Sequence, residues 1–328
     1  MSEITGKFSV IMPVFNGKNY LRACLDSVLA AMASYGNAEL LVIDNGSTDG
    51  SYEVLLNEYG RFARILQIRG ITVAAMRNHG AALADGEFLS FIDSDIIVGP
   101  DYFQQALNVL RTRADATGAK VEVPESPHWI ENTWYKIHAR SRDGFVNYIN
   151  SGNFLIVRQT FLAVNGFDET MIATEDSELG QRLNQKGYKV YEAHALRAIH
   201  LGGDKSLRVF FRKTSWRTLG MFGMLKHSWI SPPLFTTFAH MLLCSGALLI
   251  LLLSPLSLAV RLALTITLFN LAPVGSVLYR AWQRSGFYAP LQAIVLYHVY
   301  FLGRFYALYK LIFSRNLSFG ALRLKPKS

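Results

Sequence analysis

Short apolar runs alternate with stretches of helical periodicity through the first half of the chain. The runs that predict strands are residues 8–12, 39–44, 65–68 and 88–92. The stretches that predict helices are residues 19–33, 51–59 and 73–84. Pro13 is expected to stop the first strand. Strands and helices alternate at this spacing when a mostly parallel sheet is covered on both faces, so the pattern predicts a doubly wound α/β domain.

The pattern weakens over residues 116–150, where neither helix nor strand is clearly favoured. It returns with an apolar run over residues 152–157 and a helical stretch over residues 174–186. Gly187 stands just past this stretch, where a glycine commonly ends a helix.

Charge divides the chain near Asp204. Residues 1–204 carry 18 Lys and Arg and all 24 Asp and Glu, whereas residues 205–328 carry 15 Lys and Arg and no Asp or Glu. These basic residues lie among long apolar runs, which favours an anionic membrane surface over nucleic acid as the partner. Cys24 and Cys244 are isolated, so they predict neither a disulfide framework nor a zinc site. Reduced cytosol is the expected setting of the first domain.

The C-terminal part has the composition of a membrane region. Residues 205–232 mix basic and large apolar side chains, as in an amphipathic helix that lies in the interface. Residues 234–253 are 20 positions without a charge, enough to cross a hydrocarbon core of about 30 Å, and residues 258–279 are expected to return. Residues 291–313 are ambiguous, because they are apolar but contain His298, Arg304 and Lys310.

If that last stretch crossed the membrane, the basic tail would lie outside, against the positive-inside tendency. We therefore favour two spans plus an interfacial helix, with a third span as the alternative. The expected organisation is a cytosolic domain (1–204), an interfacial segment (205–232), a membrane region (233–313) and a basic tail (314–328).

Candidate chemistry lies where the predicted strands end, because ligands of doubly wound sheets bind outside the carboxyl ends of the strands. Asp93 and Asp95 follow the fourth strand and are two residues apart, so on an extended segment their side chains would lean to one side. Such a pair suits Mg²⁺ or Mn²⁺ that also binds substrate phosphates. The alternative is an ordinary turn, which Asp-Ser-Asp also favours.

Other polar residues extend this predicted site. Asp44 ends the second strand and is a candidate for hydrogen bonds to a ribose or base, and Arg77 for a diphosphate. The turn after the first strand is not glycine-rich, which excludes a dinucleotide site of the Rossmann type. Asp176 in the first turn of a helix is either a favourable helix-dipole contact or a general base, and His200 is a candidate metal or diphosphate contact.

Taken in order, these segments resemble the family-2 glycosyltransferases with the GT-A fold. The matching stretches are residues 9–17, 41–51, 76–80, 91–95, 165–169 and 174–179. The resemblance covers about residues 8–192 and implies an enzyme that takes a sugar from a nucleotide-diphosphate donor, most simply a UDP-sugar.

The resemblance also implies a role for individual residues. Asp44 would bind the nucleotide, beside the turn that contains Pro13, Val14 and Asn16. Asp93 would face the donor ribose or sugar, and Asp95, with His200 as a further candidate, would hold Mg²⁺ or Mn²⁺ on the diphosphate. Asp176 would be the base of an inverting, single-displacement transfer.

Departures from the family pattern narrow the expected activity. The Gln-x-x-Arg-Trp motif of processive synthases is absent, since residues 212–217 read Arg-Lys-Thr-Ser-Trp-Arg, so we expect one sugar per binding event. We expect a lipid-linked or membrane-proximal glycan acceptor at the cytosolic face of the inner membrane, in synthesis of an envelope polysaccharide or glycolipid. The alternatives are a polyprenyl-phosphate glycosyltransferase and a catalytically silent membrane scaffold.

Overall fold

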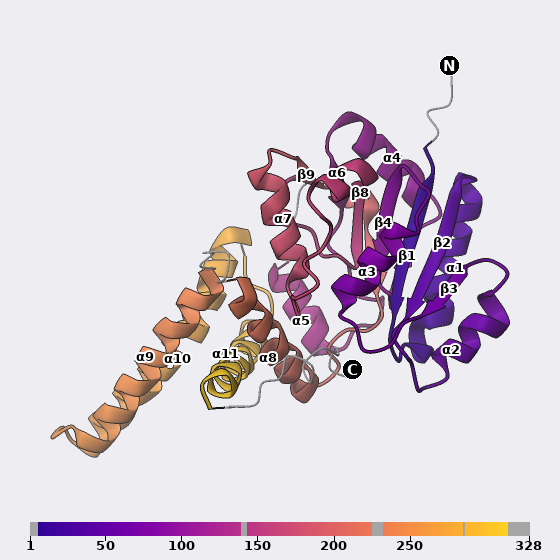
Figure 1. The fold of residues 1–328 in the computed structure, drawn as a ribbon. Coiled ribbons are helices and arrows are strands. Elements are labelled where there is room, and N and C mark those ends of the chain that lie inside the picture. The colour runs from indigo at the N-terminus through magenta and orange to yellow at the C-terminus, as the bar shows by residue number, and fades with distance from the viewer. Residues whose placement is uncertain (1–5, 139–142, 225–231, 285, 314–328) are drawn as a thin grey trace. The chain divides into compact units, whose positions relative to one another are not determined.

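The protein is described by a computed structural model that covers residues 6–138, 143–224, 232–284 and 286–313 (Figure 1). Its chain contacts divide these residues into two compact units. The first comprises residues 6–126 and 143–203, and the second comprises residues 127–138 and those that follow Gly203.

The first unit is built on an eight-stranded sheet in the order β3-β2-β1-β4-β8-β6-β9-β7. The strands are β1 (Phe8–Val14), β2 (Ala38–Asp44), β3 (Arg64–Gln67), β4 (Phe88–Ile92), β6 (Ala116–Gly118), β7 (Gly144–Phe145), β8 (Asn153–Val157) and β9 (Val190–Glu192). The first four strands are parallel to one another, and β8 runs antiparallel to both β4 and β6. The expected mostly parallel α/β fold is confirmed.

Helices cover both faces of this sheet (Figure 1). They are α1 (Lys18–Tyr35), α2 (Ser51–Val54) with the π-helical turn η1 (Leu55–Tyr59), α3 (Val73–Ala82), α4 (Tyr102–Thr112), α6 (Arg158–Ala163) and α7 (Glu175–Gln185). Alternation along β1 separates the two layers, because successive strand side chains point to opposite faces. Val10 and Met12 pack with α1 and α4, whereas Ile11 packs with α3, α6 and α7.

The first strand is longer than predicted, since β1 continues through Pro13 to Val14. The ladder between β1 and β4 reaches only as far as Ile11, whereas the ladder with β2 continues to Val14. Pro13 therefore lies where β1 pairs on one side only, and a proline without an N–H is tolerated there.

A small two-stranded sheet lies beside the main one in the same unit. It pairs β5 (Ile96–Val98) antiparallel with β10 (Ala198–His200), and η2 (His194–Leu196) precedes it. The register places His200 opposite Ile96, directly after the Asp93-Ser94-Asp95 triplet. This pairing brings residues far apart in the sequence to one point.

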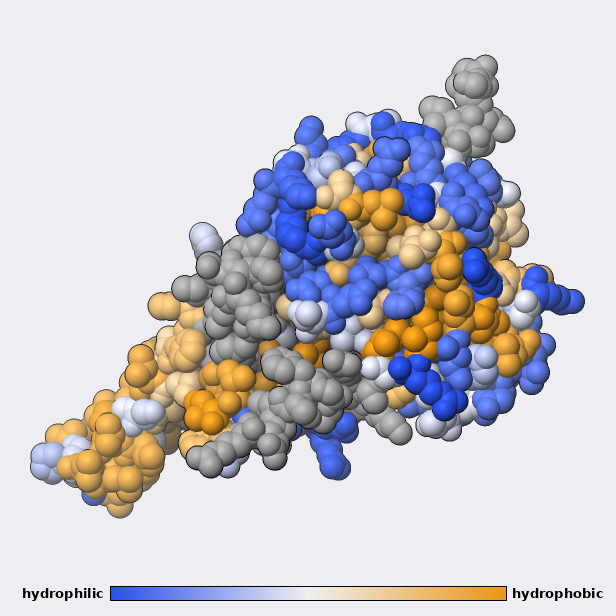
Figure 2. Space-filling view, in the orientation of Figure 1, coloured by the Kyte–Doolittle hydropathy of each residue, from blue (hydrophilic) through white to orange (hydrophobic). Residues whose placement is uncertain are grey.

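The second unit is helical. Its helices are α5 (Trp129–His138), α8 (Leu207–Met224), α9 (Pro232–Leu253), α10 (Leu258–Arg284) and α11 (Pro290–Phe313). Three helices, α9 to α11, are long and apolar enough to cross a membrane among the described residues. Figure 2 shows an almost continuous hydrophobic surface over α9 and α10, as expected for side chains that face lipid. The number of spans stays a prediction.

Candidate functional site

The loops after β1 and β2 are tied together at the carboxyl end of the sheet. The Asn16 side chain accepts a hydrogen bond from Thr48 N at 2.8 Å, and Asn16 N donates to Ser47 Oγ at 2.9 Å. Asn16 adopts a left-handed conformation with φ 52°, which asparagine tolerates better than most residues. Pro13 and Val14 are buried in β1 beneath this loop pair, so only backbone and loop side chains line the surface there.

Asp44 is fully buried, and its carboxylate holds the loop that follows β2. Its Oδ1 accepts hydrogen bonds from Gly46 N, Ser47 N and the Gln67 side chain at 2.9 to 3.0 Å. This differs from the predicted direct contact with a nucleotide, because the carboxylate is already satisfied by the protein. The structure therefore shows Asp44 as a residue that supports the loop after β2.

The Asp93-Ser94-Asp95 triplet forms a turn, which corrects the expectation of an extended segment. Ile96 N donates to the Asp93 carbonyl at 3.1 Å, and this closes the turn between β4 and β5. The two carboxylates consequently have different partners. Asp93 Oδ1 accepts from Arg77, whereas Asp95 Oδ2 lies beside His200.

Asp95 and His200 form the candidate metal pair. Asp95 Oδ2 lies 3.2 Å from His200 Nε2, and both side chains are partly exposed. The backbone reinforces this contact, since Leu201 N donates to the Asp95 carbonyl at 2.8 Å. One carboxylate and one imidazole fit Mn²⁺ or Mg²⁺ that takes its other ligands from substrate phosphates and water. Within the described residues no group of three or more His, Cys, Asp or Glu could hold a metal unaided.

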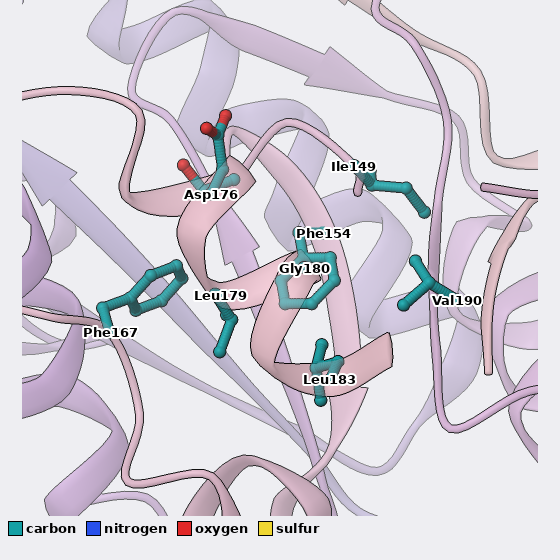
Figure 3. A pocket seen from close by; sticks show the side chains of 9 residues that line it. Ile149, Phe154, Phe167, Asp176, Leu179, Gly180, Leu183 and Val190 are labelled. Atoms are coloured by element: carbon teal, nitrogen blue, oxygen red, sulfur yellow. The ribbon is translucent and has the colours of Figure 1, made fainter. Parts of the chain in front are cut away.

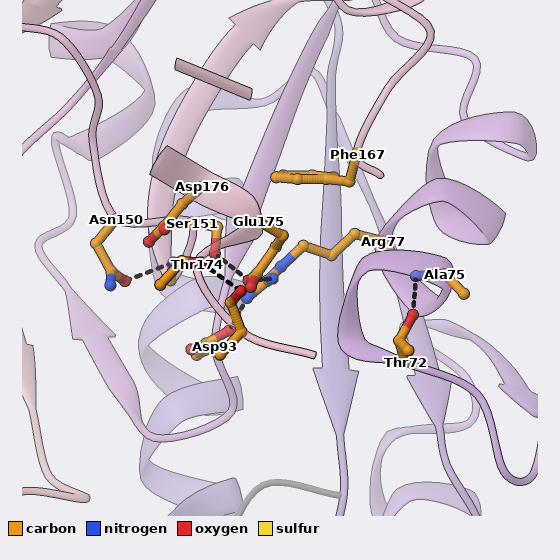
Figure 4. A network of polar contacts seen from close by, with 12 residues as sticks. Thr72, Ala75, Arg77, Asp93, Asn150, Ser151, Phe167, Thr174, Glu175 and Asp176 are labelled. Carbon is orange, nitrogen blue, oxygen red and sulfur yellow. Dashed lines mark hydrogen bonds and ion pairs between the residues drawn. The ribbon is translucent and has the colours of Figure 1, made fainter. Parts of the chain in front are cut away.

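Arg77 occupies a different place from the one we predicted. Its side chain is 2% exposed and ion-paired with two carboxylates, Asp93 at 2.6 Å and Glu175 at 2.7 Å (Figure 4). The guanidinium also lies 5.6 Å from the ring centre of Phe167. A guanidinium that is buried and paired in this way does not present itself to a diphosphate.

Asp176 begins α7 next to the Arg77 network. Its Oδ1 accepts a hydrogen bond from Ser177 N at 2.7 Å, and its side chain is partly exposed. Burial, and then the neighbouring negative charge of Glu175, raises the pKa of Asp176 to about 7. A carboxyl group with this pKa is a competent general base near neutral pH, which a purely dipole-stabilised carboxylate would not be.

The side of Asp176 away from solvent is apolar. Figure 3 shows the carboxylate at the rim of a narrow pocket whose walls include Phe154, Phe167, Leu179 and Leu183. Burial at this place disfavours the charged form of the carboxyl group and so raises its pKa.

Two glycines complete the site and were missed by reasoning from the sequence. A Cβ on Gly202 would overlap the Asp95 carboxylate, and a Cβ on Gly152 would lie 2.8 Å from Asp93 Oδ2. Each carboxylate of the triplet thus rests against a glycine. The Gly202-Gly203 pair, which only Leu201 separates from His200, was the available signal for the first of them.

A cavity of about 440 Å³ lies at the other end of β5 and β10. Its walls include Asp101, Tyr102, His194 and Arg197. None of the predicted site residues borders it, so it is separate from the candidate site.

The chain is similar in sequence to known glycosyltransferases. The family model of glycosyl transferase family 2 matches residues 9–164, and that of glycosyl transferase family group 2 matches residues 88–279. Over 103 residues the chain is 38% identical to glycosyltransferase GlyA of Streptococcus pneumoniae, a match that covers 31% of this chain and 14% of GlyA. It is 24% identical over 240 residues to the succinoglycan biosynthesis protein ExoA of Rhizobium meliloti, covering 69% of this chain and 72% of ExoA. The chain spans less than half the length of the first curated relatives that it matches.

Among solved structures, the mannosyltransferase PcManGT of Pyrobaculum calidifontis, in complex with GDP-Man and Mn²⁺, superposes with a TM-score of 0.63. The alignment covers 95% of this chain and 89% of that protein at 15% identity, so the likeness establishes the fold. The expected GT-A fold is confirmed. Because one family model spans more than half of the 328 residues, the chain belongs to the family-2 group of glycosyltransferases.

Proposed function

We propose that the protein transfers a single sugar from a nucleotide-diphosphate donor to a lipid-linked or membrane-proximal glycan, with inversion and with a divalent metal. The observation that carries the proposal is the contact between Asp95 and His200 in the same unit as Asp176, a carboxyl group with a pKa of about 7. Such a transfer requires side chains that can bind a divalent metal and a general base that is deprotonated near neutral pH.

The metal, Mn²⁺ or Mg²⁺, would be held by Asp95 and His200 and would neutralise the charge that develops on the leaving diphosphate. The solved neighbour PcManGT binds GDP-Man and Mn²⁺, which supports a nucleotide-sugar donor for this chain as well. We propose a UDP-sugar as the first donor to test. The paired loops after β1 and β2 would form the nucleotide surface.

Asp176 would act on the acceptor. The bond between the acceptor oxygen and the anomeric carbon forms while the bond from that carbon to the diphosphate oxygen breaks. The acceptor proton passes to the Asp176 carboxylate, and the nucleoside diphosphate leaves with the electron pair. Attack from the face opposite the leaving group inverts the anomeric carbon, and no covalent enzyme intermediate is needed.

The helical region suggests where the acceptor is found. Residues 1–204 would form the cytosolic catalytic domain, residues 205–232 an interfacial segment and residues 233–313 the membrane region, with a basic tail over residues 314–328. An enzyme held at the inner membrane meets a lipid-linked acceptor by diffusion within the surface. The similarity to ExoA, a succinoglycan biosynthesis protein, supports a role in polysaccharide synthesis.

A screen of nucleotide-sugars by thermal shift, with and without Mn²⁺, tests the proposal. We expect one donor to raise the melting temperature only when Mn²⁺ is present, and the same donor to transfer its sugar to a membrane extract. Failure of every nucleotide-sugar to bind or react would favour the silent scaffold. Transfer to water-soluble acceptors alone would refute the lipid-linked acceptor.

A further inference from the structure

The buried Arg77 joins segments that are distant in the sequence. Arg77 comes from α3, and its two terminal nitrogens reach carboxylates that are 16 and 98 residues away. Nη2 donates to Asp93 at 2.6 Å, and Nη1 donates to Glu175 at 2.7 Å (Figure 4). One guanidinium therefore connects the turn after β4 with the start of α7.

Neighbouring hydrogen bonds strengthen the same connection. Ser151 Oγ donates to Glu175 Oε1 at 3.1 Å, and Asp93 N donates to the Gly152 carbonyl at 3.1 Å. The segment before β8 thus contacts both carboxylate-bearing elements. Arg77, Glu175 and Ser151 are almost fully buried, so water competes little with these contacts.

The two connected elements serve opposite sides of the proposed transfer. The turn carries Asp93 and Asp95, which is one member of the candidate metal pair, on the donor side. Helix α7 carries Asp176 on the acceptor side. We infer that Arg77 is a positioning residue, which fixes the turn that carries Asp93 relative to α7 and engages the Glu175 carboxylate, leaving Asp176 as the carboxyl group that takes the proton. This inference rests on the proposed function.

The roles of Glu175 and Asp176 differ because their surroundings differ. Two adjacent carboxyl groups in a poorly solvated place do not both lose their protons easily. Glu175 has the guanidinium of Arg77 and the hydroxyl of Ser151 as partners. The charged groups that act on Asp176 are Glu175 on its own helix, which raises its pKa, and Arg77 from α3, which lowers it. Removal of the Glu175 charge alone would therefore ease ionisation of Asp176.

A lysine would not replace Arg77. Its ammonium group is a point charge, whereas the planar guanidinium presents two terminal nitrogens in a fixed fork. In Arg77→Lys one carboxylate keeps a partner and the other loses it. The fold would still contain a cation at this place, but the rigid connection between turn and helix would be lost.

Arg182 on α7 provides a matched control. It donates to Glu178 and to the carbonyls of Val164 and Gly166, so it also connects α7 to another segment by a partly buried guanidinium. These contacts involve neither Asp93, Glu175 nor Asp176. Arg182→Lys should therefore weaken a contact of α7 without disturbing the site.

The experiment compares Arg77→Lys, Glu175→Gln and Arg182→Lys in the full-length enzyme with Mn²⁺ and the donor found by the thermal-shift screen. We expect Arg77→Lys to lower kcat by about 100-fold, as misplacement of reacting groups by about 1 Å does, with little change in the KM of the donor. We expect Glu175→Gln to move the acid limb of the kcat/KM pH profile to lower pH. Arg182→Lys should change neither quantity.

Equal losses in Arg77→Lys and Arg182→Lys, or an acid limb that does not move in Glu175→Gln, would overturn the inference. If Arg77→Lys does not fold, the shift of the pH profile in the isosteric Glu175→Gln decides the matter. Absence of transfer by the unmodified enzyme would instead count against the proposed function, so the two failures are distinguishable.

Discussion

His200 Nε2 lies 3.2 Å from Asp95 Oδ2, although 105 residues separate the two in the chain. The antiparallel pairing of β5 with β10 produces this contact, because it places His200 opposite the first residue after the triplet. A backbone ladder of this kind fixes the two side chains before any ligand arrives, which lowers the cost of ordering them on binding.

Loss of either member of this pair should weaken metal binding. We expect the Mn²⁺-dependent thermal shift with the nucleotide-sugar to vanish in Asp95→Ala, since the carboxylate is the charged ligand. In His200→Ala we expect apparent Mn²⁺ affinity to fall by at least about 10- to 100-fold, the loss seen when a residue that merely supports a metal ligand is removed. Titration of Mn²⁺ against the melting temperature measures both. An undiminished shift in Asp95→Ala would exclude it as a ligand.

Gly202→Ala should act on the same pair through sterics alone. A Cβ at this position would overlap the Asp95 carboxylate, so the carboxylate must move away from His200. We expect a clear loss of Mn²⁺-dependent activity while the protein still folds, as judged by circular dichroism. Gly144→Ala is the control, because a Cβ there meets no atom within 4 Å and should change stability by less than about 0.5 kcal/mol. Equal activity of the two variants would contradict the assignment.

The pKa of Asp176 near 7 predicts how activity depends on pH. A general base must be deprotonated, so kcat/KM should rise about tenfold per pH unit below pH 7 and level off above it. Asp176→Asn should lower kcat by about 10²- to 10⁴-fold, the usual contribution of a general base. If Asp176→Asn retains most activity, the acceptor is already an anion, as in a polyprenyl-phosphate glycosyltransferase.

Stability should change with pH in the opposite direction. The folded-state pKa of Asp176 lies above its ordinary value of about 3.9, so between pH 4 and 7 the native state binds more protons than the unfolded state. The contribution of this group to the free energy of unfolding is therefore fully present at low pH and is lost as pH rises towards 7. Asp176→Asn should remove this part of the pH dependence, and urea unfolding at several pH values measures it.

Much of the fold followed from the sequence because it depends on local pattern. Strand β4 was predicted with the bounds that the structure has, since a continuous apolar run between polar turns leaves little choice. The bounds of the helix predicted over residues 174–186 also agree closely with those of α7. Acidic residues begin this helix, and Gly187 follows it in a left-handed conformation with φ 80°. These features are decided by neighbours in the chain.

The site was less accessible to prediction because it depends on distant partners. Nothing near Arg77 in the sequence indicates that Asp93 and Glu175 enclose it, so an exposed contact with a diphosphate was the natural expectation. Asp44 looked like a ligand-binding acid for the same reason, since its hydrogen bonds to Gln67 and the following loop arise only in the folded sheet. The extended geometry expected for the triplet failed because the turn to β5 is set by the β5–β10 pairing.

The path of α11 decides on which side of the membrane the chain ends. This helix is long and apolar enough to cross, yet it carries Arg304, which is 3% exposed and donates to Thr237 of α9 at 2.7 Å. A buried arginine that is held by a neighbouring helix does not itself prevent insertion. The basic tail still favours two spans, with the tail on the side of the catalytic unit.

Two engineered cysteines show on which side of the membrane each position lies. They are Ser328→Cys in the tail and the control Glu53→Cys in the catalytic unit, each in a background of Cys24→Ala and Cys244→Ala.

A membrane-impermeant maleimide should label both engineered cysteines only after the cells are permeabilised, because an even number of spans returns the tail to the cytosol. Labelling of Ser328→Cys in intact cells, with Glu53→Cys still protected, would establish three spans. Labelling of Glu53→Cys in intact cells would instead place the catalytic unit outside, where cytosolic nucleotide-sugars do not reach it. The pair of positions therefore tests the number of spans and the orientation separately.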